Sequence, residues 1–202
     1  MTAEHDRGQP SRESSSRALR RLRVVDAFID LVLHGEVPPT PSEAAERAGV
    51  SRATFFRYFS SFDEFRGEAA ARVRERFPEL FAIPDIGTGN LDQRVERFVD
   101  ARLQLHETLH PMALLMQARA ARDADASDFL DGVRQAMAEQ VRQHFDAYLR
   151  LHSPERRDDV VAAIAVLTSV ESWRQFRHSH GRSPDQTRRA WRKALAGILA
   201  QP

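Results

Sequence analysis

The chain has 202 residues, 42% of them hydrophobic, a net charge of +1 and no cysteine, enough for one domain or a small domain joined to a larger one. The absence of cysteine excludes disulfide bonds and thiolate metal sites, and the near-zero net charge means that any nucleic-acid surface depends on local placement of charge. No apolar run approaches the roughly 18 residues of a membrane span, and the N-terminal residues lack the apolar block of a signal peptide, so we expect a cytoplasmic protein without membrane contact.

The first predicted element is an arginine-rich helix behind a polar tail. Residues 1–16 are rich in serine and arginine, which predicts a disordered tail. From Arg17 to Gly35, apolar residues recur in alternating steps of four and three and predict one helix, with Gly35 as its C-cap. Four arginines with no acid among them begin this helix: Arg17, Arg20, Arg21 and Arg23.

Two short helices follow. Thr40 can cap the first of them, Pro41 suits its first helical position, and Glu43 completes a Thr-x-x-Glu capping box. This helix stops at Gly49, and Ser51 then caps the second one. Two short helices joined by a glycine-containing turn form a helix-turn-helix.

The second short helix carries aromatic side chains on more than one face. At about 100° per residue, Phe55 and Phe59 share a face that can pack against the preceding helices, whereas Ala53 points the opposite way. Phe56 and Tyr58 are expected at the two edges of the exposed face. A face that is small in its middle and edged by polar side chains fits a DNA major groove. The same angles fit a helical hairpin with a solvated arginine face, so both interpretations stay open on angles alone.

The stretch TPSEAAERAGVSRATFFRYFSSFDEF, residues 40–65, resembles the DNA-binding segment of the TetR family of one-component transcriptional regulators. That family's pattern is a short helix ending in Ala-Gly-Val-Ser, a helix with Thr-Leu/Phe-Tyr-x-His/Tyr-Phe, and a Ser-Lys-Glu-Glu-Leu-like start of the next helix. The resemblance implies an all-α fold, with a three-helix helix-turn-helix domain over residues 17–65 and a larger helical effector-binding and dimerisation domain over residues 66–202. It also implies double-stranded operator DNA as a partner.

The exposed face and the resemblance together give the residues expected at the DNA surface: Thr40, Ser42, Ser51, Arg52, Ala53, Thr54, Phe56, Arg57 and Tyr58. Two positions depart from the family pattern. Phe56 replaces a common tyrosine, which leaves only apolar contact with a sugar or a thymine methyl group. Phe62 replaces a common lysine, which removes a phosphate-binding cation. Our hypothesis is that the arginines of the first helix supply the missing positive charge.

The remaining sequence predicts further helices. The element that begins at Phe62 continues through residue 81, and a loop follows at IPDIGTGN, residues 83–90. Its two glycines and one proline make this loop a candidate boundary or flexible turn. Helical patterns then cover approximately residues 91–109, 111–122, 127–151, 155–179 and 185–200.

One stretch in this part matches a metal motif. HETLH, from His106 to His110, satisfies H-E-x-x-H, in which two histidines one turn apart bind zinc and the glutamate acts as general base. Pro111 follows at once, so we expect the helix to end at His110, and no third ligand is evident. We therefore expect no metal, cofactor or catalytic residue, and keep a zinc hydrolase through His106, Glu107 and His110 as the enzymatic alternative.

Residues 160–170 carry no charge, which predicts a helix that is apolar on every side and needs cover on both faces. The protomer's own core can supply one cover and a second copy the other; a simple buried core helix is the alternative. The family resemblance implies a twofold homodimer through the last two long helices. The expected interface residues are Val166, Val170, Trp191, Leu195 and Ile198.

The resembled family commonly holds a small-molecule pocket in its larger domain. Met112, Met116, Phe145 and Trp173 are the candidate lining residues for an unknown, mainly hydrophobic effector, with ordinary core packing as the alternative. The expected function is a repressor that such an effector releases from a palindromic operator. A constitutive DNA-binding or protein-interaction module without a ligand is the alternative function.

Overall fold

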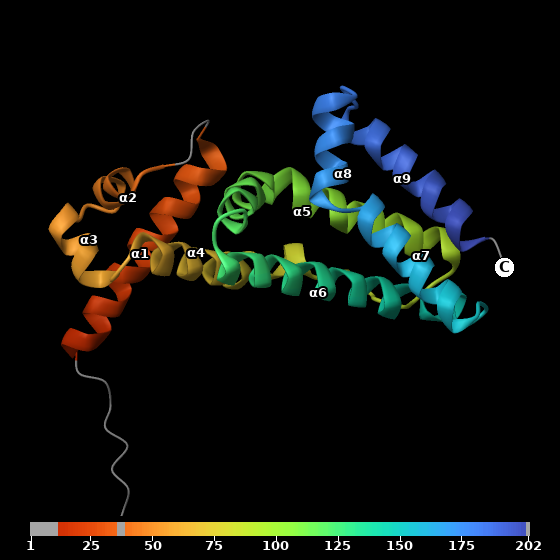
Figure 1. The fold of residues 1–202 in the computed structure, drawn as a ribbon, viewed down its shortest axis with the longest axis horizontal. Helices are drawn as coiled ribbons and strands as arrows, with labels where there is room; N and C mark the ends of the chain where they lie inside the picture. The colour runs from red at the N-terminus through yellow and green to blue at the C-terminus, as the bar shows by residue number, and fades with distance from the viewer. Residues whose placement is uncertain (1–11, 36–38, 201–202) are drawn as a thin grey trace, which may run out of the picture. The chain divides into compact units, whose positions relative to one another are not determined.

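The computed structural model describes residues 12–35 and 39–200. Within this part every regular element is helical, which confirms the all-α prediction (Figure 1). None of the described helices is long and apolar enough to cross a lipid bilayer. The α-helices are α1 (Arg12–His34), α2 (Pro41–Arg47), α3 (Arg52–Tyr58), α4 (Phe62–Arg76), α5 (Leu91–Ala120), α6 (Ala124–Leu149), α7 (Pro154–Leu167), α8 (Val170–Arg174) and α9 (Pro184–Leu199).

The expected disordered tail overlaps the start of α1. Residues 1–11 of that tail lie outside the described residues, but residues 12–16 are helical, so the prediction was wrong for them. Extending a nucleated helix costs much less than starting one, and the strongly patterned segment after Arg17 supplies the nucleus. The helix ends at His34, directly before the expected cap Gly35.

The chain divides into two compact units, with the boundary between Glu75 and Arg76. The boundary lies beyond the expected one after residue 65, because α4 belongs with α1. Phe65 of α4 is fully buried, 4.9 Å between ring centroids from Phe28 of α1. Further along α4, Arg72 donates to the Asp26 carboxylate at 2.9 Å.

In the second unit, α5 packs against α6 and α9, while α7 packs against α6 and α9. The segment predicted to form the loop before α5 is indeed not α-helical, but it lies inside this unit and not at its boundary. Asn90 then caps α5 through a capping box with Gln93. The largest fully buried side chains of this core are Phe98, Phe145, Ile164, Trp173, Trp191 and Leu195.

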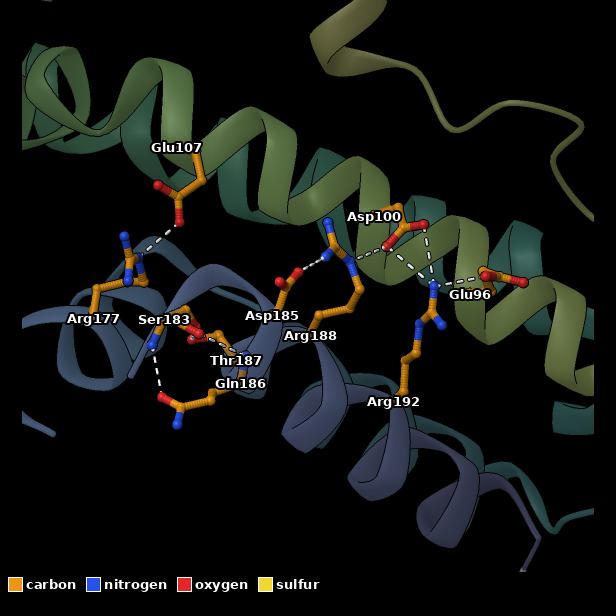
Figure 2. Close-up of polar contacts among 10 residues, drawn as sticks. All are labelled: Glu96, Asp100, Glu107, Arg177, Ser183, Asp185, Gln186, Thr187, Arg188 and Arg192. Carbon is orange, nitrogen blue, oxygen red and sulfur yellow. Dashed lines mark hydrogen bonds and ion pairs between the residues drawn. The ribbon is translucent and has the colours of Figure 1, made fainter. Parts of the chain in front are cut away.

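An ionic ladder fastens α9 to α5, as Figure 2 shows. Arg188 donates to Asp100 at 2.8 Å, and Arg192 donates to Glu96 at 2.8 Å. All four side chains are at least one third exposed, so each pair adds little stability by itself. The ion pairs join two helices that also pack together through apolar side chains.

The predicted helix end at His110 is wrong, because α5 continues through Pro111 to Ala120. A proline inside a helix loses one backbone hydrogen bond and strains the preceding turn. Here Leu109, Met112 and Met116 are buried on both sides of the proline in sequence. Burial of this apolar face offsets the local cost, a case of tertiary packing overriding a sequence signal.

The predicted helix over residues 155–179 is also wrong, since it is broken after Leu167. The Thr168 hydroxyl donates to the Ile164 carbonyl at 2.8 Å, and Ser169 caps α8 by accepting from the Ser172 amide. Serine and threonine favour such caps over helix interiors because their hydroxyls compete for backbone groups. After α8 the chain forms a single π-helical turn, Gln175–Ser179.

Candidate nucleic-acid interface

The start of α2 forms as the sequence predicts. The Thr40 side chain accepts from the Glu43 amide, and the Glu43 carboxylate accepts from the Thr40 amide at 2.6 Å, which completes the capping box. Hydrogen bonds from the Thr40 backbone and side chain lower the pKa of Glu43. The Thr40 hydroxyl also donates to the Glu43 carboxylate, at 2.8 Å. Ser42 beside it is exposed.

The turn between α2 and α3 depends on one glycine. Gly49 has a φ of 68°, in the left-handed region that side chains other than glycine rarely adopt. The Val50 amide then donates to the Ala45 carbonyl at 2.9 Å, which folds the chain back on α2. Ala44 and Ala45 are buried, consistent with a close crossing of the two helices. Ser51 caps α3 by accepting from the Thr54 amide.

Buried aromatic rings anchor α3. Phe55 and Phe59 are both fully buried, as their helical angle predicts. The Phe55 ring lies 5.1 Å from that of Phe59 and 4.9 Å from that of Phe65, measured between centroids. The Phe55–Phe65 pair is edge-to-face and the Phe55–Phe59 pair is tilted, and such ring contacts add to the stability that burial already provides. These rings therefore anchor one face of α3 in the core of the first unit.

The opposite face of α3 is open to solvent. Arg52, Ala53, Phe56 and Arg57 are exposed, and Phe56 keeps 48% of its surface accessible. The Arg52 guanidinium lies 5.7 Å from the centre of the Phe56 ring. Thr54 is only half-buried and accepts a hydrogen bond from Ser51 at 3.0 Å. A small alanine thus separates cationic and aromatic side chains on one short surface.

Tyr58 does not lie at an exposed edge, so this prediction was wrong. Only 5% of its surface is accessible. The guanidinium groups of Arg17 and Arg57 each lie 6.0 Å from the centre of its ring. Arg17 also donates to the Arg57 carbonyl at 3.0 Å. The helical angle of Tyr58 could not reveal this cover, because it comes from a distant helix.

Arg20, Arg21 and Arg23 of α1 differ in their partners. Arg21 donates to Glu64 at 2.8 Å and to Glu68 at 3.0 Å, both on α4. Hydrogen bonds from Ser60 and Arg21 lower the pKa of Glu64 to about 2. Among the residues that the structure describes, Arg20 and Arg23 make no ion pair; Arg20 donates a hydrogen bond to the Ser16 hydroxyl, at 3.3 Å. The charges of Arg20 and Arg23 therefore have no carboxylate partner among the described residues.

Phe62 occupies the position where the resembled family commonly has lysine. Its ring stacks on Phe65 at 5.7 Å and meets Phe28 edge-on at 6.2 Å. Arg66 lies over the same ring, 4.1 Å from its centre. The residue therefore extends the aromatic core and carries no charge toward a ligand.

Beside α3 the structure has an open cleft of about 540 Å³. Its walls come from α1, from the turn between α2 and α3, and from α3 itself. The lining residues are Arg20, Arg23, Ala48, Gly49, Val50, Ser51, Thr54, Arg57 and Tyr58. Arg20 and Arg23 belong to the arginines of the first helix that we expected to supply positive charge, and they line this cleft beside α3.

The H-E-x-x-H residues are engaged elsewhere. The buried His106 imidazole donates through Nε2 to the Thr168 carbonyl at 2.9 Å. Glu107 accepts from Trp173 at 3.0 Å and from Arg177 at 2.8 Å, the latter contact being drawn in Figure 2. The His110 ring packs on Trp173, with centroids 4.7 Å apart. A zinc site would need these three side chains to be free. Here they instead contact Thr168, Trp173 and Arg177, which hold α5 against the segment that contains α8.

Burial predicts a pH effect through His106. Burial lowers the pKa of His106 to about 4, against about 6.5 for a free histidine, and Arg102 and His110 also disfavour the charged form. Between pH 7 and pH 4 the unfolded chain gains a proton that the folded chain resists. We expect the free energy of unfolding to fall by about 3 kcal/mol from this residue alone.

Chemical denaturation followed by tryptophan fluorescence can measure this effect, because Trp173 and Trp191 are the only tryptophans. His106→Gln should lessen the loss of stability between pH 7 and pH 4, while the exposed His180→Gln should leave it unchanged. Burial also lowers the pKa of His144, so the comparison is made between variants and not on the wild type alone. Equal pH dependence in wild type and His106→Gln would contradict the prediction.

The structure buries all four candidate effector residues. Met112 and Met116 lie on α5, Phe145 on α6 and Trp173 on α8, each with less than one tenth of its surface accessible. Phe145 and Trp173 belong to one packed core cluster, which does not include Met112 or Met116.

The structure divides the expected dimer-interface residues. Trp191 and Leu195 are fully buried in the core of their own unit, so the prediction that they form a surface was wrong. Their face of α9 packs against α5 and α7. Val170 and Ile198 are half-buried, whereas Val166 keeps 70% of its surface accessible. Val166 shares its face of α7 with the exposed Ala162 and Ala163.

The chain was compared with known proteins. No protein-family model matches it, and no curated protein sequence matches it. A TetR-family transcriptional regulator from Streptomyces coelicolor is similar in structure, with a TM-score of 0.72, 22% identity, and coverage of 91% of this chain and 81% of that one. A candidate transcriptional regulator from Streptomyces coelicolor A3(2) gives a TM-score of 0.58 at 19% identity, covering 90% of this chain and 99% of that one. The fold is therefore that of TetR-family regulators.

Proposed function

We propose that this chain is a DNA-binding transcriptional regulator that inserts α3 into the major groove of an operator. The observation that carries the proposal is the exposed face of Arg52, Ala53 and Phe56 on a helix whose other face is locked by Phe55 and Phe59. A rigid short helix with cationic side chains and a small central residue suits close approach to base edges. The fold shared with a TetR-family regulator supports the same function.

The side chains of α3 and of the start of α2 have distinct chemical roles in this proposal. Ala53 lets the helix backbone approach the groove. Arg52 can donate two hydrogen bonds to one guanine, and Phe56 can contact a thymine methyl group. Arg57, Ser42, Ser51 and Thr54 can reach phosphates, which position the protein without specifying sequence. The Thr40 hydroxyl donates to Glu43 and would have to change partner to donate to a phosphate.

The regulator is proposed to act as a twofold homodimer. Residues Ala162, Ala163 and Val166 form an exposed apolar face on α7, and the protomer's own core covers the opposite face through Val160, Val161 and Ile164. A second copy can cover this uncharged face, because a twofold interface brings the same patch of both protomers together. In a dimer, two copies of α3 can enter successive major grooves if they lie about 34–36 Å apart.

A small hydrophobic effector is proposed to release the operator. Met112, Met116, Phe145 and Trp173 are buried, so an effector in contact with them must open the packing of the second unit. A ligand that binds the opened conformer better than the closed one shifts the population toward it. Release of DNA follows if the opened conformer holds the two copies of α3 at another spacing.

Selection of bound duplexes from a random DNA pool tests the proposed function. We expect enrichment of a palindromic site whose two halves are centred about one helical turn apart. Compounds are then screened for release of the best site. If no sequence is enriched over the starting pool, the result would contradict sequence-specific DNA binding. If a ligand saturates the second unit and still does not release the enriched site, the result would favour a constitutive DNA-binding module.

A further inference from the structure

The arginine-lined cleft beside α3 gives α1 a role that the helix-turn-helix alone does not have. We infer that this cleft binds one backbone phosphate of the operator, so that α1 is a DNA-contacting helix. The inference rests on the proposed function and adds to it a third helix and a defined phosphate contact.

No carboxylate lines the cleft, although the first unit has several acids. Arg20 and Arg23 of α1 and Arg57 of α3 line it. Guanidinium groups that share a cleft repel one another, and within the described residues no carboxylate pairs with these three. A phosphate oxygen would relieve that repulsion and accept charge-assisted hydrogen bonds. The charge of the cleft therefore favours the binding of an anion.

The neighbouring arginines show that this charge is not a general property of α1. Arg21 is in the same turn, and its guanidinium pairs with Glu64 and Glu68. Arg17 donates to the Arg57 carbonyl and covers the Tyr58 ring, and so fixes the wall of the cleft. Carboxylates therefore neutralise Arg21, whereas Arg20 and Arg23 keep their charge in the cleft beside α3.

The cleft also has the right position relative to the exposed face. Ser51, Thr54 and Tyr58 line it at helical spacing, so it occupies one flank of α3, next to Arg52, Ala53 and Phe56. When a helix lies in a major groove, the sugar-phosphate strands run along its flanks. A Cβ atom at Gly49 would meet no atom within 4 Å, so the wall of the cleft is open at this residue.

The volume favours a phosphodiester over a free ion. A cleft of about 540 Å³ exceeds what one phosphate group fills, and its open side can admit the sugars that flank a backbone phosphate. The wall hydroxyls of Ser51 and Thr54 are bonded to each other at 3.0 Å, and the pair can still contribute one donor to an incoming oxygen.

The test compares the variant Arg20→Gln/Arg23→Gln with the wild type on the selected operator at several salt concentrations. One phosphate lost per protomer should reduce the slope of log K against log salt by about 1.8 per dimer, at about 0.9 for each phosphate. Affinity should fall about tenfold or more, equally for operator and unrelated duplexes, so that the specificity ratio is kept. Arg21→Gln is the matched control, since it removes a charge that is already paired, and should keep the slope.

Operators with a single uncharged methylphosphonate linkage identify the phosphate. The wild type should lose affinity at one linkage in each half-site, and the double variant should be indifferent to that same linkage. Unchanged affinity and slope in the double variant would overturn the inference while the proposed function stands. A wild type that binds no duplex would overturn both. Tight binding of inorganic pyrophosphate that the double variant loses, with DNA binding unchanged, would assign the cleft to a free anion instead.

Discussion

Replacing Phe55 by alanine is expected to destabilise the first unit by about 3–5 kcal/mol. The Phe55 ring is fully buried and lies about 5 Å from the rings of Phe59 and Phe65. Its removal leaves a cavity that a short helix held by one face cannot close. The loss is a large part of the 5–15 kcal/mol that stabilises a typical domain. Operator binding should be lost with it.

Amide hydrogen exchange measures this effect separately for each unit. Protection should fall in α1–α4 and stay unchanged in α5–α9, because the two units have separate cores. Phe56→Ala is the matched control: it removes the same ring from the next position, where 48% of the surface is exposed, and should cost little stability. Equal destabilisation by the two variants would show that α3 is not anchored through Phe55.

The second large effect concerns the proposed dimer. Val166→Arg places a charge on the exposed apolar face of α7 and should convert a dimer to a monomer without unfolding it, since 70% of the side chain is accessible. A monomer engages one half-site at a time, so operator affinity should fall by about 100-fold or more. Sedimentation equilibrium gives the mass, and fluorescence anisotropy gives the affinity.

The control for this variant is Leu151→Arg. Leu151 keeps 75% of its surface accessible and precedes α7, near the end of that helix away from Val166. It should leave both mass and affinity as in the wild type. A monomeric wild type that binds a palindromic operator tightly would contradict the dimer, and so would a Val166→Arg protein that stays dimeric.

The parts of the fold that sequence analysis predicted correctly are those set by local chemistry. Thr40 and Glu43 form their capping box, and Ser51 caps α3, because each hydrogen bond spans only three residues. The helical angle likewise separates the buried Phe55 from the exposed Phe56. These signals need no knowledge of the remaining chain.

The wrong predictions concern residues whose environment comes from elsewhere in the chain. Tyr58 is buried because Arg17, about forty positions earlier, lies over it. Pro111 does not end α5 because the surrounding apolar side chains are buried by other helices. A hydropathy pattern cannot distinguish Trp191, buried in its own protomer, from Val166, which remains exposed.

The candidate site was predictable in its centre and not in its flank. The exposed residues Arg52, Ala53 and Arg57 follow from helix geometry. The partition of the α1 arginines does not, because Arg21 and Glu68 are 47 residues apart in sequence. Only the packing of α1 against α4 determines which guanidinium is neutralised and which remains beside α3.

The specificity of α3 can be measured by repeating the random-pool selection with two alanine-to-glutamate variants. Ala53→Glu puts a bulky anion at the centre of the exposed face, and Ala71→Glu makes the same change at an exposed position of α4. We expect the wild type and Ala71→Glu to enrich the same palindrome and Ala53→Glu to enrich none, with all three proteins equally stable to heat. Enrichment of that palindrome by Ala53→Glu would contradict the assignment of α3 as the helix that recognises DNA.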